Sequence, residues 1–262
     1  MTPSRIRTRL SLESWHMTAE LRDLTVHIDT GRWSATVLTA VDLVVPRGQI
    51  TAVLGEPGAG KTMVARALTG RLPATARHRG QVLINGEVVD DRQWSLLRGS
   101  VVGYLPQEGV TAFEPETTVG TQLRALELHH RAWSIERACA AAHYPAYALD
   151  LLPQQNSGGQ IQRAALAAAL LPAPPVLIAD GPTNSLDLET AYAVWKSLRD
   201  YADSGAAVLV ISNEIQMLTA GGLADRMVII REGRILAAGP AVQLSESADG
   251  YVRALLESSS QS

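Results

Sequence analysis

Short apolar runs of strand length recur at wide intervals along this chain. Residues 50–54, 176–179 and 207–211 are almost entirely apolar and rich in β-branched side chains. A strand without alternating polar positions is typical of a parallel sheet that is covered on both faces. We therefore predict a buried, largely parallel sheet assembled from segments that lie far apart in the sequence.

Two further patterns surround this predicted sheet. Residues 19–55 alternate apolar and polar positions, as in an antiparallel β-subdomain. Asn85-Gly86 and Glu232-Gly233 each separate two short apolar runs, and both predict a hairpin. Residues 120–151 place Ala, Leu, Glu, Arg and His at helical spacing, which predicts a small helical subdomain within about 108–170.

The chain is expected to contain one domain with two flanking segments. We predict that residues 17–245 form the domain and that residues 246–262 form a C-terminal tail. Residues 1–16 contain three arginines but no apolar core of the kind found in secretory signals. We expect that leader to be disordered or to result from an upstream start site, and in either case to carry no chemistry.

Residues 55–62 read Gly-Glu-Pro-Gly-Ala-Gly-Lys-Thr and match the phosphate-loop pattern G-x-x-x-x-G-K-[ST] at every fixed position. A predicted strand precedes them and a helix-forming segment follows. Glycines allow backbone N–H groups to turn towards phosphates, and the helix start directs its positive end at them. The residues expected to bind ATP here are Gly55, Gly58, Ala59, Gly60, Lys61 and Thr62. The predicted fold class is therefore an α/β P-loop NTPase with a β-subdomain and a helical subdomain.

Asp180 ends the apolar run of residues 176–179. A carboxylate at the carboxyl end of a parallel strand, close to a phosphate loop, is placed to hold Mg²⁺. An apolar run ending in Asp is by itself equally typical of a strand followed by a turn. The phosphate loop favours the magnesium site, in which Thr62 is the second expected ligand.

Residues 156–163 read Asn-Ser-Gly-Gly-Gln-Ile-Gln-Arg. A serine and paired glycines at a helix start leave N–H groups free to face a second phosphate group, although an isolated S-G-G-Q is also typical of a flexible linker. In this order and spacing the segment resembles the signature motif of ABC ATPases, usually L-S-G-G-Q. The resemblance implies that Ser157, Gly158, Gly159 and Gln160 close on ATP held by another subunit. The sequence contains no internal repeat, so that subunit is expected to be a separate chain.

Two other segments resemble elements of the same family. Gln107 is similar to the Q-loop glutamine, which in the family senses Mg²⁺ and the γ-phosphate and links to the membrane partner. Ser185, Leu186 and Asp187 resemble the D-loop, which crosses the dimer interface. The resemblance therefore adds Gln107 to Thr62 and Asp180 as residues around Mg²⁺.

The subgroup is indicated by segments outside the shared motifs. Residues 111–115 and 120–123 are similar to the segment that follows the Q-loop in peptide- and nickel-type importer ATPases. Residues 250–256 are similar to a C-terminal sequence of that subgroup. The resemblance implies an oligopeptide, dipeptide or nickel importer, and peptide, nickel and metal-chelate cargoes stay open.

Three positions depart from the family pattern, and all fall in the chain's own nucleotide pocket. Gly181 stands where the family has a catalytic glutamate, so no side chain there can orient or deprotonate water. Asn213 stands at the switch histidine and cannot carry an imidazolium charge. Ile28 stands where an aromatic ring stacks on adenine and offers only apolar contact. The signature departs only at Asn156, which replaces the leading leucine.

These departures predict an asymmetric pair of ATP sites. Losing a positioned base typically costs ~10²–10⁴ in rate, whereas the contacts that bind phosphate need not suffer. We expect this chain to hold Mg·ATP in a hydrolysis-impaired site and to complete a competent site on a paralogous ATPase. Alternatively, Glu214 or Asp187 acts as the base in place of the missing glutamate. The competing interpretation is that both are solvated loop carboxylates. Changing Gly181→Glu and Asn213→His together is predicted to raise turnover.

Composition limits the remaining classes. The chain has 262 residues, a net charge of −3 and no apolar run of the ~20 residues needed to cross a bilayer. It lacks the basic stripe that duplex nucleic acid requires. Its one cysteine, Cys139, excludes an internal disulfide framework and is expected to be a packed helix residue. His129, His130 and Trp133 are expected to be surface and packing residues in preference to metal ligands.

The resemblance implies a peripheral subunit on the cytoplasmic face of the membrane. Its expected partners are a paralogous ABC ATPase, two transmembrane permease subunits and an extracellular substrate-binding protein, with ATP and Mg²⁺ as cofactors. Two alternatives stay open: a soluble ABC module that acts in assembly or repair, and a purely regulatory subunit that binds ATP.

Overall fold

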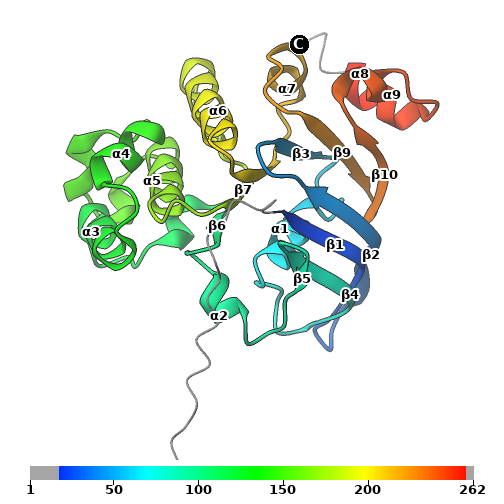
Figure 1. Ribbon diagram of the computed structural model, residues 1–262, viewed down its shortest axis with the longest axis horizontal. Helices are drawn as coiled ribbons and strands as arrows, with labels where there is room; N and C mark the ends of the chain where they lie inside the picture. Colours follow the sequence, from blue (N-terminus) through cyan, green and yellow to red (C-terminus); the bar gives the residue numbers. More distant parts are fainter. Residues whose placement is uncertain (1–17, 258–262) are drawn as a thin grey trace, which may run out of the picture.

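A six-stranded sheet forms the centre of the computed structural model, which describes residues 18–257 (Figure 1). Its strands are β3 (Ile50–Leu54), β6 (Val102–Leu105), β7 (Val176–Asp180), β8 (Ala207–Ile211), β9 (Arg226–Arg231) and β10 (Arg234–Gly239). The order is β10-β9-β3-β8-β7-β6, and only β10 runs antiparallel to its neighbour. The three predicted apolar runs are adjacent central strands, β3, β8 and β7, and are buried throughout. The predicted parallel sheet is confirmed.

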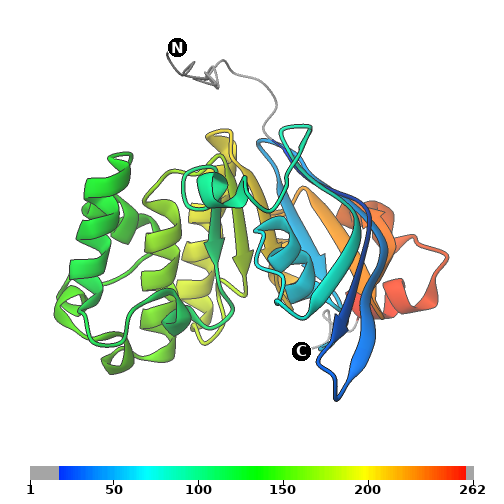
Figure 2. The same cartoon turned by 90° about the horizontal axis from the view of Figure 1, so that it is seen from below.

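A smaller antiparallel sheet lies against the central one (Figure 2). It contains β1 (Ala19–Asp29), β2 (Ser34–Val45), β4 (Ala76–Ile84) and β5 (Glu87–Val88), in the order β2-β1-β4-β5. Both predicted hairpins are present, β4–β5 here and β9–β10 in the central sheet. Helix α1 (Lys61–Leu68) packs between the two sheets, where its apolar face meets side chains of β1 and β2. The α/β P-loop fold with an antiparallel β-subdomain is therefore confirmed.

Helices between β6 and β7 gather at one side of the central sheet (Figure 1). These segments are η1 (Gly109–Ala112), α3 (Val119–His130), α4 (Ile135–Ala141), η2 (Ala146–Asp150), η3 (Pro153–Gln155) and α5 (Gly158–Leu170). The short α2 (Trp94–Leu97) precedes β6. Cys139 is buried on α4, and burial raises the pKa of its thiol to about 11. The thiol therefore stays protonated at neutral pH and acts as a packing residue, as predicted.

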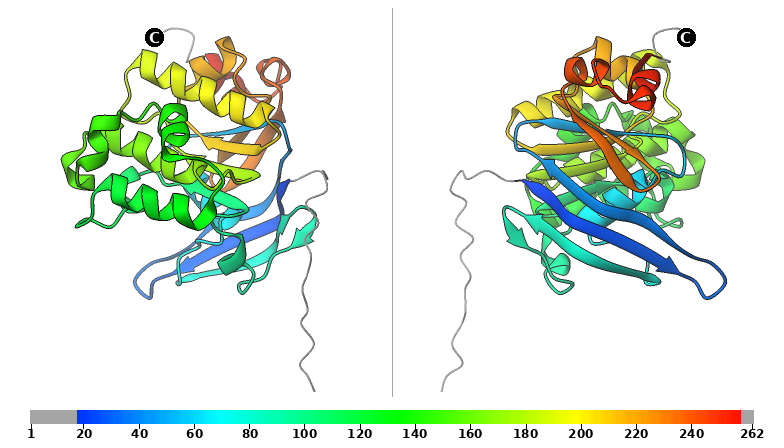
Figure 3. Two further views of the ribbon diagram at one scale, coloured as in Figure 1. Left: turned by 60° about the vertical axis from the view of Figure 1, so that its left-hand side comes forward. Right: turned by 90° about the vertical axis from the view of Figure 1, so that its right-hand side faces the viewer.

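Four helices complete the outer face of the sheet. They are α6 (Leu188–Asp203), α7 (Ile215–Ala220), α8 (Ala241–Ser245) and α9 (Gly250–Glu257). Figure 3 shows α8 and α9 beside the β9–β10 hairpin. Much of the segment predicted as a tail is thus α9, whose Val252 and Leu256 are buried in the core with α5 and α6. Among the described helices, none has the length and apolar character needed to cross a membrane.

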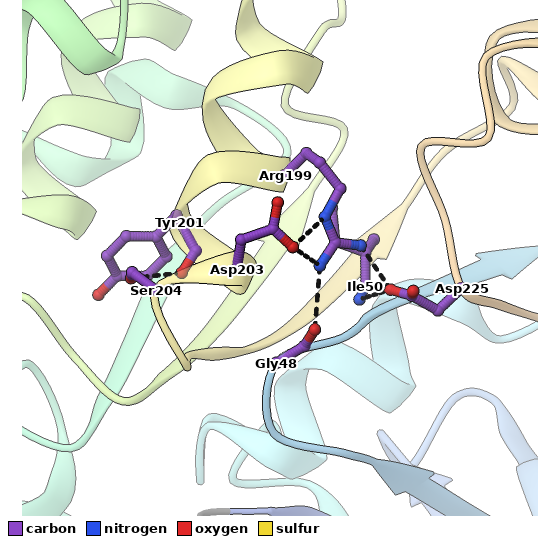
Figure 4. A network of polar contacts seen from close by, with 7 residues as sticks. All are labelled: Gly48, Ile50, Arg199, Tyr201, Asp203, Ser204 and Asp225. Atoms are coloured by element: carbon purple, nitrogen blue, oxygen red, sulfur yellow. Dashed lines mark hydrogen bonds and ion pairs between the residues drawn. The ribbon is translucent and has the colours of Figure 1, made fainter.

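Arg199 on α6 ties the amino ends of two strands together (Figure 4). Its guanidinium donates to the Gly48 carbonyl oxygen at 3.0 Å and pairs with Asp203 at 2.8 Å and Asp225 at 2.5 Å. Asp225, just before β9, also accepts the N–H of Ile50, the first residue of β3, at 2.7 Å. This network fastens the amino edge of the sheet. The loops that follow the carboxyl ends of the parallel strands lie at the opposite edge.

Candidate nucleotide-binding site

The phosphate loop leaves the carboxyl end of β3 and leads directly into α1. Gly60, the N-cap of α1, has φ 105°. A Cβ there would lie 2.9 Å from Leu38 Cδ2 and 3.0 Å from the Val37 carbonyl oxygen, so both conformation and space require glycine. At Gly58 an added Cβ would meet nothing within 4 Å. The loop is therefore packed against β2 on one side and open on the other.

Lys61 and Asp180, predicted from separate motifs, are neighbours in the fold. Lys61 Nζ donates to the carbonyl oxygens of Gly55 at 2.5 Å and Glu56 at 3.0 Å. Burial lowers the pKa of Lys61, and the charge of Asp180 opposes that change. The ammonium thus lies between the start of the phosphate loop and the end of β7.

Asp180 and Thr62 together fit the predicted magnesium site. Asp180 is 2% exposed, and its Oδ2 is buried without a hydrogen-bond partner. Burial raises the pKa of Asp180, while a hydrogen bond with Thr62 and the charges of Lys61 and Arg66 lower it. An unpartnered carboxylate oxygen beside a hydroxyl is the kind of donor set that Mg²⁺ prefers, with phosphate oxygens and water completing the shell. Within residues 18–257 there is no cluster of three or more His, Cys, Asp or Glu that could hold a metal elsewhere.

Gln107 is exposed and lies just beyond the end of β6, the strand next to β7. The chain on both sides of it is held by Gln162 on α5, which is only 3% exposed. Gln162 Oε1 accepts the Gly109 N–H at 2.8 Å, and its Nε2 donates to the carbonyl oxygens of Pro106 at 3.1 Å and Gly181 at 3.0 Å. The sequence indicated Gln162 only as part of the Gln-Arg pair after the signature. At helical spacing its neighbours include Gly159, Ala165 and Leu166, and this small and apolar face was the available signal for a buried hydrogen-bond role.

Gly181 is covered by a side chain from the following turn. Its φ is 61°, and an added Cβ would lie 2.2 Å from Asn184 Nδ2 and 2.7 Å from its Cγ. The Gly181 carbonyl oxygen accepts the Asn184 N–H at 3.2 Å as well as the Gln162 amide. The position expected to lack a base is therefore also closed to a larger residue by backbone conformation and by the Asn184 amide.

The two alternative bases are both engaged in other contacts. Glu214 Oε2 accepts hydrogen bonds from the Thr183 hydroxyl and, at 3.0 Å, from the Trp195 indole. Asp187 caps α6, accepting the Thr190 N–H at 2.9 Å and the Thr190 hydroxyl at 2.8 Å. Hydrogen bonds from Thr190 lower the pKa of Asp187, which makes that carboxylate a weaker base. Both oxygens of Asp187 and one oxygen of Glu214 are therefore hydrogen-bonded within the chain.

Asn213 and Ile28 occupy different parts of the fold. Asn213 lies exposed in a bend directly after β8, between the ends of β3 and β7 in sheet order. Ile28 is half-buried near the end of β1, where it pairs with Ala35 on β2 and Ala76 on β4. The structure therefore places Asn213 with the other strand-end residues and Ile28 on the smaller sheet.

The signature forms a complete helix cap at the start of α5. Ser157 Oγ accepts the Gln160 N–H at 3.2 Å, and Gln160 Oε1 accepts the Ser157 N–H at 2.8 Å. Asn156, the departure from the family pattern, accepts the buried Tyr144 hydroxyl at 3.0 Å and donates to the Leu152 carbonyl oxygen at 3.0 Å. The polar side chain of Asn156 thus takes the place of the leucine that the family usually has here, and the helix cap remains complete.

The two signature glycines face different surroundings. A Cβ at Gly159 would lie 2.8 Å from Leu186 Cδ2 and 2.9 Å from the Ser185 carbonyl oxygen. At Gly158 the nearest atom would be Ser185 Cβ, at 3.5 Å. The chain's own D-loop segment packs on Gly159, while Gly158 is exposed.

Comparisons with known proteins agree with the family that the motifs resemble. The ABC transporter family model matches residues 38–184. The oligopeptide transport ATP-binding protein OppD of Mycobacterium tuberculosis is 31% identical over 83% of this chain, which spans only 37% of that protein's length. The metal-staphylopine import system ATP-binding protein CntD of Staphylococcus aureus is 28% identical, covering 80% of this chain and 82% of that protein.

Solved structures show the same fold. The ATP-binding cassette MJ0796 bound to ADP and Pi gives a TM-score of 0.75 at 23% identity, over 85% of this chain and 98% of that one. A bacterial Atm1-family ABC exporter with ATP bound gives 0.77 at 20% identity, over 94% of this chain and 42% of that one.

Proposed function

The chain belongs to the ABC transporter family, and from this premise we propose that it is the ATP-binding subunit of an importer, with a hydrolysis-impaired site of its own. One observation carries the proposal. Lys61 and Thr62 lie close to Asp180, while the next position, Gly181, has no side chain and is covered by Asn184. Groups that bind a triphosphate are present, and a group that would prepare water for attack is missing.

Each predicted residue has a defined role in this proposal. The phosphate loop, residues 55–60, binds the phosphates through backbone N–H groups, and Lys61 contributes its charge. Thr62 and Asp180 hold Mg²⁺, with Gln107 beside them, and the bound ion neutralises phosphate charge. Ile28 makes apolar contact with the adenine ring.

The signature serves a second site in this proposal. Ser157 to Gln160 would contact ATP held by a paralogous ATPase, and Ser185 to Asp187 would cross the interface between the two subunits. The exposed Gly158 and the intact helix cap support this assignment. The pair would then hold two nucleotides and turn over one of them.

A hollow beside the Q-loop offers a place for the membrane partner. Its volume is about 350 Å³, and its lining includes Tyr104 and Pro106 from the β6 end and Leu126 and His130 from α3. The named relatives are transport and import ATP-binding proteins. We place the subunit on the cytoplasmic face of the membrane, with a permease segment in this hollow and an extracellular substrate-binding protein delivering a peptide, nickel or metal-chelate cargo.

Single-turnover hydrolysis by the assembled complex tests the proposal. The catalytic glutamate of the partner ATPase is replaced by Gln, so that any remaining turnover comes from the pocket of this chain. We expect ATP to be retained and its hydrolysis to be slower by ~10²–10⁴ than in an unmodified partner site. Rapid hydrolysis in this assay, or failure of the purified chain to bind ATP, overturns the proposal.

A further inference from the structure

Glu214 connects three segments that surround the candidate pocket. One carboxylate oxygen, Oε2, accepts both the Thr183 hydroxyl and the Trp195 indole N–H. Thr183 lies in the turn between β7 and α6, Trp195 lies on α6, and Glu214 directly precedes α7. Thr183 is 2% exposed and Trp195 is fully buried, so both donors need an internal acceptor, and the same carboxylate serves both.

The contacts of Glu214 continue towards the phosphate loop. Its backbone N–H donates to Ser212 Oγ at 3.0 Å, and the Ser212 N–H donates to the Val53 carbonyl oxygen at 3.4 Å. Val53 is on β3, two residues before the phosphate loop begins at Gly55. Hydrogen bonds therefore run without a break from the strand that carries the phosphate loop to Glu214.

On its other side, Glu214 reaches the segment that leads to the D-loop. Thr183 is followed by Asn184, whose amide covers Gly181, and then by residues 185–187. Residues 185 and 186 pack on Gly159 at the start of the signature helix. Glu214 is thus the junction between the Asn213 bend and the segment that we assign to the subunit interface.

We propose that Glu214 is a positioning residue that fastens the Asn213 bend to the turn carrying the D-loop, so that contact with the partner subunit controls how long this chain retains ATP. The inference rests on the proposed function. Asn213 cannot make a charged contact, and the residues on either side of it are held by the bonds from Ser212 to β3 and from Glu214 to Thr183 and Trp195. In this role the Glu214 carboxylate accepts hydrogen bonds through Oε2 and takes no proton from water.

The test measures release of a fluorescent ATP analogue from the two-subunit complex, with the partner's catalytic glutamate replaced by Gln. Thr183→Val removes the hydroxyl while keeping the side-chain shape, and Glu214→Ala removes the acceptor. We expect Thr183→Val to accelerate release about 3- to 10-fold, because one hydrogen bond to a charged group is partly lost. Glu214→Ala also leaves the Trp195 indole without its acceptor, so it should accelerate release at least as much. The double variant should be no faster than Glu214→Ala alone, because the bond lost in Thr183→Val is already lost in Glu214→Ala.

Two further variants show whether the effect is specific. Glu214→Gln keeps an amide oxygen at the acceptor position and should restore release to within about twofold of the unmodified complex. Thr51→Val is the matched control, since Thr51 is a buried threonine on β3 whose hydroxyl has no hydrogen-bond partner. It should leave release unchanged. In the isolated chain, Thr183→Val should also leave release unchanged, because the D-loop then has no partner to meet.

Three results overturn the inference. Lower melting temperatures with unchanged release would assign Glu214 a structural role only. Loss of residual hydrolysis in Glu214→Gln with unchanged release would make it a base. Equal acceleration in the isolated chain and the complex would show that the partner subunit has no part in the effect. Failure of the proposed function is distinguishable, because it appears as absent ATP binding or rapid own-site hydrolysis in the unmodified complex.

Discussion

The candidate nucleotide pocket and the signature segment carry different kinds of side chain, and our proposal assigns them different chemistry. In the pocket, Lys61 lies near Asp180, and we propose that Gly181 and Asn213 stand where a competent site has its base and its switch. At the start of α5, the cap formed by Ser157 and Gln160 is complete. In this proposal both regions bind phosphate, and only the pocket lacks groups that act on water.

The comparison separates affinity from turnover. A phosphate is held by N–H dipoles and a lysine whether or not a base is nearby. Hydrolysis additionally needs a group that takes a proton in the transition state. A subunit can therefore lose the second function and remain necessary, provided its signature still serves another site.

Replacing Lys61 should have the largest effect on the pocket side of this comparison. Lys61→Met removes a charged donor from the phosphate loop, and we expect ATP affinity to fall by about 100-fold or more. Titration with a fluorescent ATP analogue measures the change. Glu56→Gln, at an exposed position of the same loop, is the control and should change affinity little. Near-normal binding by the Lys61 variant would contradict the assignment of ATP to this pocket.

Changing Gly158 tests the signature side. Gly158→Ala adds a methyl group with no contact closer than 3.5 Å, so the fold should be unaffected. Turnover of the complex should nevertheless fall about 100-fold, the size typical when a preorganised phosphate-facing donor is blocked. Gly159→Ala is the contrasting variant, because its Cβ would collide with Leu186 and should lower the melting temperature. Unchanged turnover with Gly158→Ala would favour the purely regulatory alternative.

Introducing a glutamate at position 181 would make the ATP site of this chain more like the site that we propose on the partner ATPase. Gly181→Glu with Asn213→His should raise own-site hydrolysis less than about tenfold, because φ 61° and the Asn184 amide oppose a side chain there. Adding Asn184→Ala should relieve the contact and bring the gain towards about 100-fold. Single-turnover assays measure each gain, and Asn184→Ala alone is the control. Equal gains with and without the Asn184 change would show that this amide is no obstacle.

Asp180→Asn should change stability in a pH-dependent way. Burial raises the pKa of Asp180, so its contribution to folding is most favourable below its unfolded pKa and is lost as pH rises through the folded value. At neutral pH the neutral amide should therefore raise the melting temperature, and the difference from the parent should shrink towards pH 4. The same change should weaken Mg·ATP binding about tenfold. A lower melting temperature at neutral pH would contradict this sign.

Local patterns predicted most of the fold. The Asn85-Gly86 turn produces the β4–β5 hairpin, and the apolar run before Gly55 produces β3, because both depend on neighbouring residues alone. The phosphate loop and the signature cap are equally local. Their residue types and spacing were sufficient to place Lys61 at a helix start and Ser157 at an N-cap.

Contacts between distant segments could not be predicted in this way. Gln162 joins loops 53 residues before it and 19 residues after it, and Glu214 meets a hydroxyl 31 residues away. These distances along the chain become hydrogen bonds only because the parallel sheet brings several strand ends to one edge. No periodicity or motif encodes which side chains then face one another.

The sequence by itself therefore determined what each residue can offer: Lys61 and Asp180 carry charge and Gly181 has no side chain, since those properties belong to each residue's chemistry. Only the tertiary structure decided that Asn184 covers Gly181 and that Glu214 and Asp187 are already engaged. The reason is physical: the identity of a side chain sets what it can donate or accept, while packing sets which partner it meets.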